Sequence, residues 1–208
     1  MGLRETKKLH MRQELADEAM RLFAERGFDH VTVAEVAAAV GVSEKTVFNY
    51  FPTKEDLFFD EVPERQAALA AAVRARKPGE SILEALRLLH AGQCPRLCSP
   101  GFVTFARIIE DSPALQAKEL EVMAGFSQTL ADAIRSELGV DERDARIAAG
   151  LVVSVHRQFF RAARKQALAG KHGPAAVRRL RADLDRAYEL LEHGLGGLES
   201  TNAAARAG

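Results

Sequence analysis

The chain has 208 residues, with 29 basic and 29 acidic side chains and a formal net charge of zero. A hydrophobic fraction of 47% and a charged fraction of 28% are typical of a soluble, globular protein, and the neutral charge excludes a protein coated in basic residues. No stretch of apolar residues approaches the ~20 needed to cross a bilayer, and two cysteines are too few for a disulfide framework. Without a secretory signal at the N-terminus, we expect a cytoplasmic protein with no membrane partner.

The first predicted helix spans residues 8–26. Leu15, Ala19 and Leu22 recur at helical spacing and form one apolar stripe. Gly27 follows this stripe and is expected to end the helix. We expect the short segments outside the helical pattern, residues 1–7 and 199–208, to be flexible.

Three helix starts are crowded into the next stretch. Thr32 and Glu35 form a capping box, which predicts a short helix ending at Gly41. Ser43 has the side chain of an N-cap and predicts a second short helix to about residue 51. A further capping box at 53–56 predicts a longer helix that runs to residue 76.

The remainder of the chain is also helical in pattern. Its predicted helices are 80–92, 101–111, 113–138, 141–169 and 174–194, separated by proline and glycine. The fold class is therefore all-α. We expect an N-terminal three-helix domain over residues 8–58 and a larger helical domain over residues 59–198.

The two short helices joined at Gly41 have the pattern of a helix-turn-helix. Val36, Val40 and Val47 are spaced to face inward, which leaves the polar side chains of the second helix facing outward. A helix of this kind fits the major groove of DNA, where Lys and Asn read base edges and hydroxyl groups reach phosphates. The pattern alone also suits a purely structural helix pair.

Residues 10–58 resemble the DNA-binding region of TetR-type bacterial repressors. The resemblance is carried by AERGFDHVTVAEVA at 24–37 and GVSEKTVFNYFPTKEDL at 41–57. It implies a homodimer that binds a palindromic double-stranded DNA operator through its N-terminal domain. It also implies a C-terminal domain that binds a small ligand and dimerises. The DNA-contacting residues that it implies are Thr32, Lys45, Thr46, Asn49, Tyr50 and Lys54. The helix-turn-helix pattern itself adds Ser43, Glu44 and Phe48 to the predicted DNA-binding residues.

Two residues depart from the family pattern. Phe48 replaces the usual Tyr, so a hydroxyl that would point at phosphate is missing. Glu44 replaces a neutral or basic residue; its carboxylate repels phosphate, although it is able to accept a hydrogen bond from cytosine N4. Residues 1–58 carry a net charge of −2, so we expect few phosphate contacts and a shallow salt dependence of DNA binding.

Large apolar side chains in the second half suggest a cavity between helices, with core packing as the simpler interpretation. The candidate ligand-binding residues are His90, Phe102, Phe105, Arg107, Ile109, Met123, Phe126, His156, Phe159 and Phe160. Residues 107–138 resemble, more weakly, a branch of the family that binds acyl-CoA-like ligands, which implies an apolar or acyl-CoA-like inducer. Basic residues at 157–165 would suit CoA phosphates, a solvated helix face, or the rim of a dimer.

The last two predicted helices carry the expected dimer interface. An apolar stripe on the final helix, paired with the helix before it, would form a four-helix bundle across a two-fold axis. The residues expected there are Val152, Leu180, Leu184, Tyr188 and Leu191. Packing of the same stripe within one chain is the alternative.

His90, Cys94 and Cys98 recur at intervals of four and would share one side of an unbroken helix, where they resemble metal ligands. Pro95 is expected to interrupt that helix, and a closed zinc site needs a fourth ligand. We therefore expect no metal and no cofactor. The common hydrolase, metalloprotease and phosphate-binding motifs are absent from the sequence, so we expect no enzymatic activity.

The sequence favours a ligand-responsive transcriptional repressor in which the helix predicted at 53–76 links the two domains. Two alternatives remain open. One is an all-helical dimeric small-molecule-binding protein whose helix-turn-helix no longer binds DNA. The other is a protein-interaction module without a pocket.

Overall fold

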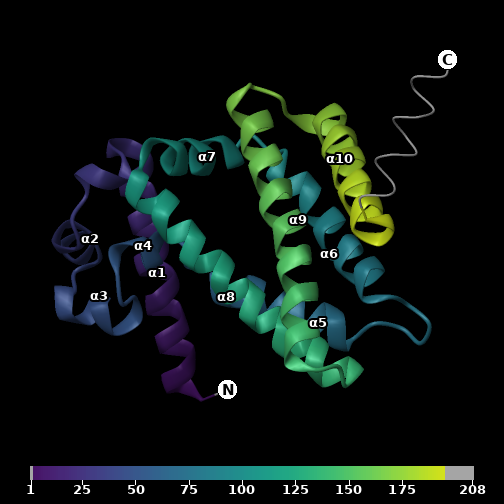
Figure 1. Ribbon diagram of the computed structural model, residues 1–208. Coiled ribbons are helices and arrows are strands. Elements are labelled where there is room, and N and C mark those ends of the chain that lie inside the picture. Colours follow the sequence, from purple (N-terminus) through teal and green to yellow (C-terminus); the bar gives the residue numbers. More distant parts are fainter. Residues whose placement is uncertain (1, 195–208) are drawn as a thin grey trace. The chain divides into compact units, whose positions relative to one another are not determined.

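The computed structural model describes residues 2–194, which form helices and no strand (Figure 1). The predicted tail at 199–208 and the last residues of the predicted second domain, 195–198, lie outside the described residues. The helices are α1 (Leu3–Arg26), the short 3-10 helix η1 (Phe28–His30), α2 (Val33–Val40), α3 (Glu44–Tyr50), α4 (Lys54–Phe58), α5 (Val62–Arg74), α6 (Ile82–Leu97), α7 (Phe102–Asp111), α8 (Pro113–Leu138), α9 (Glu142–Leu168) and α10 (Gly173–His193).

The chain divides into two compact units. The N-terminal unit contains the described residues up to Pro63 together with Thr104–Leu120, and the C-terminal unit contains Glu64–Val103 together with the described residues from Glu121 onward. The helices α7 and α8 therefore each contribute residues to both units. The predicted domains, 8–58 and 59–198, assign neither helix to the N-terminal part.

The core of the N-terminal unit is built from one side of each of its helices. Leu15, Phe23, Val36 and Val47 are at most 1% exposed and belong to one apolar cluster. The residues Ile108, Ile109 and Leu115 complete this cluster from α7 and α8. The predicted apolar stripe of α1 is confirmed, although α1 begins at Leu3, five residues before the predicted start.

The predicted caps of the short helices are confirmed. The Thr32 hydroxyl accepts from the backbone N–H of Glu35, and the Ser43 hydroxyl accepts from that of Thr46 at 3.2 Å. Between these helices Gly41 adopts the left-handed conformation, with φ 76° and ψ 31°. An L-residue with a Cβ is disfavoured there, which explains why the turn between α2 and α3 is made by glycine.

The single helix predicted at 53–76 is wrong, because two helices, α4 and α5, occupy this stretch. The chain turns at Phe59, whose carbonyl accepts from the N–H of Val62 at 3.0 Å. Pro63 then lies in the first turn of α5, where its missing N–H needs no partner. This proline is the signal in the sequence for a new helix start.

The predicted end of a helix at residue 92 is also wrong, since α6 continues through Pro95 to Leu97. Pro95 is exposed and lies in the last turn, where the helix tolerates the lost hydrogen bond. The bounds of α7 to α10 agree with the predicted helices to within one residue at each end.

The C-terminal unit is assembled from long helices. In this unit α6, α9 and α10 pack against one another (Figure 1). The apolar stripe of α10 faces inward, with Leu180, Leu184 and Tyr188 at most 3% exposed. Close packing also occurs on α8, where a Cβ added at Gly125 would approach the Gln66 amide of α5 to 2.6 Å.

Candidate functional site

The outer side of α3 presents a polar surface with one aromatic ring. Val47 is 1% exposed and anchors the helix to the core, while the side chains of Glu44, Lys45, Phe48 and Asn49 are exposed. These four residues, all predicted to contact DNA, are therefore brought together on one accessible face, which we call the α3 face.

The remaining predicted residues of α3 take part in the local structure. The Thr46 hydroxyl lies 2.9 Å from that of Ser43, so the two predicted contact residues bond to each other at the start of the helix. Tyr50 is half-buried and packs against the apolar cluster of the N-terminal unit. The α3 face thus consists of fewer residues than the sequence suggested.

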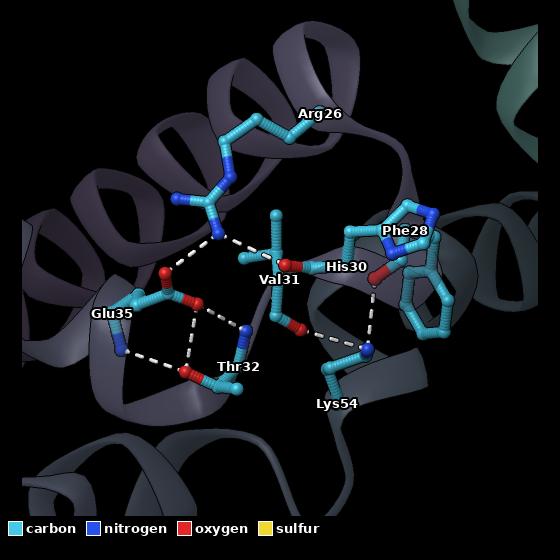
Figure 2. A network of polar contacts seen from close by, with 7 residues as sticks. All are labelled: Arg26, Phe28, His30, Val31, Thr32, Glu35 and Lys54. Atoms are coloured by element: carbon cyan, nitrogen blue, oxygen red, sulfur yellow. Dashed lines mark hydrogen bonds and ion pairs between the residues drawn. The ribbon is translucent and has the colours of Figure 1, made fainter.

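The start of α2 is held by a network of polar contacts (Figure 2). The Glu35 carboxylate accepts from the backbone N–H and the hydroxyl of Thr32, both at 2.8 Å, and lies 2.6 Å from the Arg26 guanidinium. The backbone N–H of Thr32, followed by Arg26, lowers the pKa of Glu35 to about 2. Thr32 is exposed, but its hydroxyl proton is directed at Glu35 and not at solvent.

Lys54 is held inside the N-terminal unit. Its ammonium donates to the backbone carbonyls of Phe28 and Val31, each at 2.8 Å, and lies 4.0 Å from the centre of the Phe28 ring (Figure 2). Partial burial lowers the pKa of Lys54. Two of the three donors of Lys54, a residue predicted to contact DNA, therefore join α4 to η1 and the residue after it, and one donor is left for another partner.

Arg12 has a comparable structural role that the sequence did not indicate. Its guanidinium donates to the carbonyl of Asp60 at 2.9 Å and lies 4.7 Å from the centre of the Phe51 ring. Near the start of α1, Lys7 and Lys8 are exposed.

Two histidines meet in the core of the C-terminal unit. His90 of α6 is 0% exposed and His156 of α9 is 4% exposed. The Nε2 of His90 lies 2.7 Å from Nδ1 of His156, and the Nδ1 of His90 lies 2.8 Å from the Tyr188 hydroxyl of α10. These three side chains form a buried chain of hydrogen bonds, which we call the histidine chain.

Aromatic rings enclose the histidine chain. Phe126 and Phe160 each lie 4.7 Å from His156 between ring centres, and Phe159 lies 5.5 Å from His90. The Arg65 guanidinium lies 5.5 Å from the centre of the Phe160 ring. The sequence did not single out Arg65, and only its place on α5 near an aromatic ring identifies it.

Burial keeps both imidazoles neutral. It lowers the pKa of His90 to about 4. It also lowers the pKa of His156 well below the usual value, with further contributions from His90 and Arg65. Among residues 2–194, His156 has no hydrogen-bond partner besides His90, so its Nε2 is left for another group.

The predicted ligand-binding residues that are gathered around one position are His90, Phe126, His156, Phe159 and Phe160. Phe102 is buried and Met123 half-buried in the C-terminal unit. Phe105 and Ile109 belong instead to the core of the N-terminal unit, where Phe105 stacks on Phe58 at 4.6 Å. Arg107 is exposed.

The predicted dimer residues require a correction. Val152, Leu180, Leu184 and Tyr188 are each at most 3% exposed within a single chain, so their side chains are not available to a partner. Leu191 is half-buried. The stripe packs α10 against α6 and α9, because an apolar pattern identifies a buried face without identifying what covers it. The large apolar residues of α9 that remain exposed are Ile147, Leu151 and Leu168, at 57%, 54% and 41%.

The cysteines do not combine with His90 into a metal site. Both thiols are buried, and burial raises the pKa of each. Among residues 2–194, no group of three or more His, Cys, Asp or Glu side chains is placed to hold a metal ion. A hollow of about 760 Å³ lies beside Cys98 and is lined by Pro95, His172, Val177 and Arg178 among others.

Comparisons with known proteins support the identification of the helix-turn-helix. The family model described as "Bacterial regulatory proteins, tetR family" matches residues 15–60. The transcriptional regulator TcmR of Streptomyces glaucescens is 30% identical over 151 residues, which are 69% of this chain and 67% of that protein.

Solved structures share the fold. NalD, the secondary repressor of the MexAB-OprM multidrug efflux pump in Pseudomonas aeruginosa, superimposes with a TM-score of 0.56 at 19% identity, over 86% of this chain and 95% of that one. FadR from Bacillus subtilis, solved with stearoyl-CoA, gives a TM-score of 0.53 at 19% identity, over 86% and 96%. No helix in the described part of the chain is long and apolar enough to span a membrane.

Proposed function

The chain belongs to the TetR family of bacterial transcriptional regulators, and we propose that it is a repressor that binds a palindromic operator as a homodimer and is released by a small molecule. The observation that carries the DNA-binding part of this proposal is the α3 face. Its side chains are exposed although the opposite side of the same helix is buried. Lys45 and Asn49 supply donors suited to base edges in the major groove.

The test of DNA binding is a selection from a pool of random duplexes, sequenced after several rounds at low and at moderate salt. A TetR-type repressor enriches a palindrome, because a two-fold dimer presents two copies of α3 about one helical turn of DNA apart. If no sequence is enriched while the protein is folded and dimeric, this proposal is wrong. A small-molecule-binding protein with an inactive helix-turn-helix would then be favoured.

We propose that the inducer binds beside the histidine chain. The three polar side chains of the histidine chain are buried and bonded to one another. The hydrogen bond of His156 within residues 2–194 uses Nδ1, so its Nε2 is left for a ligand. Phe126 and Phe160, each 4.7 Å from that imidazole between ring centres, supply apolar surface next to it. A suitable ligand is largely apolar, with one group that hydrogen-bonds to His156.

The inducer class can be tested with three probes of increasing polarity: 1-decanol, decanoic acid and decanoyl-CoA. Each is added to the complex of protein and selected duplex, and release of the duplex is followed by fluorescence anisotropy. An acyl-CoA-responsive regulator, as the weaker resemblance suggests, responds to decanoyl-CoA alone. Release of the duplex by the alcohol or the acid indicates that the CoA group is not needed. Whichever probe is active, we expect His156→Phe to weaken its release of the duplex.

Release would follow from a shift between two conformations. The inducer stabilises a conformation in which the two copies of α3 no longer match the spacing of about 34–36 Å between successive major grooves. Because coupling between two binding sites is reciprocal, operator DNA must weaken inducer binding by the same factor by which the inducer weakens DNA binding. Titrations in both orders check this equality.

A further inference from the structure

Phe48 is an exception among the aromatic residues of the N-terminal unit. Its side chain is 47% exposed, whereas Phe23, Phe28, Phe51 and Phe58 are at most 3% exposed. Among residues 2–194, Phe48 takes part in no ring contact, and its neighbour Val47 already anchors α3 to the core. The fold of the unit therefore gives no reason for an aromatic ring at this position.

The chemistry of the phenyl ring limits what it can recognise. It has no hydrogen-bonding group, so it makes no contact of that kind with a phosphate or with a polar base edge. The apolar group that a major groove offers is the C5-methyl of thymine, which phenylalanine is suited to contact. An exposed phenyl ring on the α3 face is thus complementary to thymine.

Glu44 lies one turn before Phe48 on the same side of α3 and is also exposed. Its carboxylate makes no hydrogen bond or ion pair within residues 2–194. A carboxylate accepts hydrogen bonds only, and the donor that cytosine presents in the major groove is its N4 amino group. Guanine and thymine are disfavoured at the same position, because their major-groove edges present acceptors, to which a carboxylate cannot donate a hydrogen bond.

We propose that Phe48 and Glu44 together read a pyrimidine-rich part of each half-site, with Phe48 on a thymine methyl and Glu44 on the amino group of a cytosine. This inference rests on the proposed DNA-binding function. Four residues of helix rise about 6 Å, and bases on one strand are about 3.4 Å apart. The thymine and the cytosine therefore lie within about two base steps of each other.

The test removes single methyl groups from the selected operator. Each thymine of a half-site is replaced in turn by deoxyuridine, which lacks the C5-methyl, and affinity is measured by fluorescence anisotropy. For the unmodified protein we expect one replacement to weaken binding about fourfold, the effect of losing one buried methyl-sized group. The same replacement has no effect on Phe48→Ala, whereas Phe48→Tyr, which retains the ring, still responds to it.

Glu44 is tested by Glu44→Gln, whose amide is able to donate as well as accept. We expect this variant to lose the preference for cytosine at one position of the half-site while the deoxyuridine effect remains. Both side chains are exposed, so circular dichroism should show folded variants. If a palindrome is enriched but no methyl effect depends on Phe48, this inference is overturned and the proposed function stands. If nothing is enriched, both fail.

Discussion

The two units of the molecule use polar side chains in opposite ways. In the N-terminal unit, short-range hydrogen bonds such as that from the Glu35 backbone to Thr32 hold the helices and leave the α3 face open. In the C-terminal unit, His90 and His156 lie inside the core and bond to each other. A surface that binds a large charged partner can be built from exposed groups, whereas a site for a small apolar ligand has to place its polar groups in the interior.

The largest expected difference between the two units is a loss of stability of the C-terminal unit at acid pH. The folded pKa of His90 is lowered to about 4 from 6.5, so the unfolded chain takes up protons first as the pH falls. Stability contributed by the neutral imidazole is complete above pH 6.5 and is lost between about pH 6.5 and 4. We expect the free energy of unfolding to fall by about 3 kcal/mol over this range, at about 1.4 kcal/mol per pH unit. Urea titrations at four pH values measure this loss.

The histidine chain can be broken at its centre. His90→Leu fills a similar volume but leaves the Tyr188 hydroxyl and the His156 imidazole without a shared partner. We expect a loss of about 3 kcal/mol, because a buried polar group left unpaired costs about 1–3 kcal/mol. The matched control is the triple variant His90→Leu, His156→Phe and Tyr188→Phe, which removes the unpaired groups and recovers part of the loss. A triple variant less stable than the single one would contradict this account.

Lys54 tests whether the contact with the loop before α2 is structural. Lys54→Met keeps the aliphatic chain but leaves the carbonyls of Phe28 and Val31 without their donor. We expect a loss of about 2 kcal/mol in the unfolding of the N-terminal unit, typical of hydrogen bonds to a charged group. The control Lys45→Met, at an exposed position of α3, should leave the urea midpoint unchanged. Equal midpoints for both variants would mean that Lys54 has no structural role.

The smallest effect concerns the turn between α2 and α3. A Cβ at Gly41 meets no atom within 4 Å, so Gly41→Ala costs only the left-handed backbone conformation, about 1 kcal/mol. Gly150, in the interior of α9, also has open space and an ordinary helical backbone. Gly150→Ala should therefore stabilise the protein by about 0.5–1 kcal/mol. In thermal unfolding, the midpoint temperature should fall for Gly41→Ala and rise for Gly150→Ala. If both midpoints moved in the same direction, a backbone requirement for glycine at position 41 would be refuted.

The sequence predicts the N-terminal helices well because their signals are local. A capping box such as Thr32 with Glu35, or a glycine in a turn, acts over three or four residues and needs no knowledge of the remaining chain. The two helix boundaries that were predicted wrongly, near Pro63 and Pro95, also depend on a local feature. Pro63 is a local signal for a helix start, and Pro95 is tolerated because it falls in a last turn, so in both cases the position of the proline within the helix decides.

The arrangement of the C-terminal unit depends on contacts between distant residues. His90 and His156 are 66 residues apart, and His90 and Tyr188 are 98 apart, so no local pattern indicates that they meet. Tyr188 was expected at a dimer interface because an apolar stripe does not reveal its partner. The contacts of Lys54 with the carbonyls of Phe28 and Val31, more than 20 residues earlier in the chain, were likewise not indicated by any local pattern.

The central claim is that the exposed side of α3 binds DNA, and affinity for the selected palindrome tests it most directly. We predict that the double variant Lys45→Ala and Asn49→Ala binds at least tenfold more weakly, since a good base contact contributes about 1–3 kcal/mol, while its urea midpoint is unchanged. The matched control, Lys77→Ala and Gln128→Ala, removes the same charge and an amide from exposed positions of the C-terminal unit and should bind like the unmodified protein. Equal affinity for the α3 variant and the control would contradict the claim.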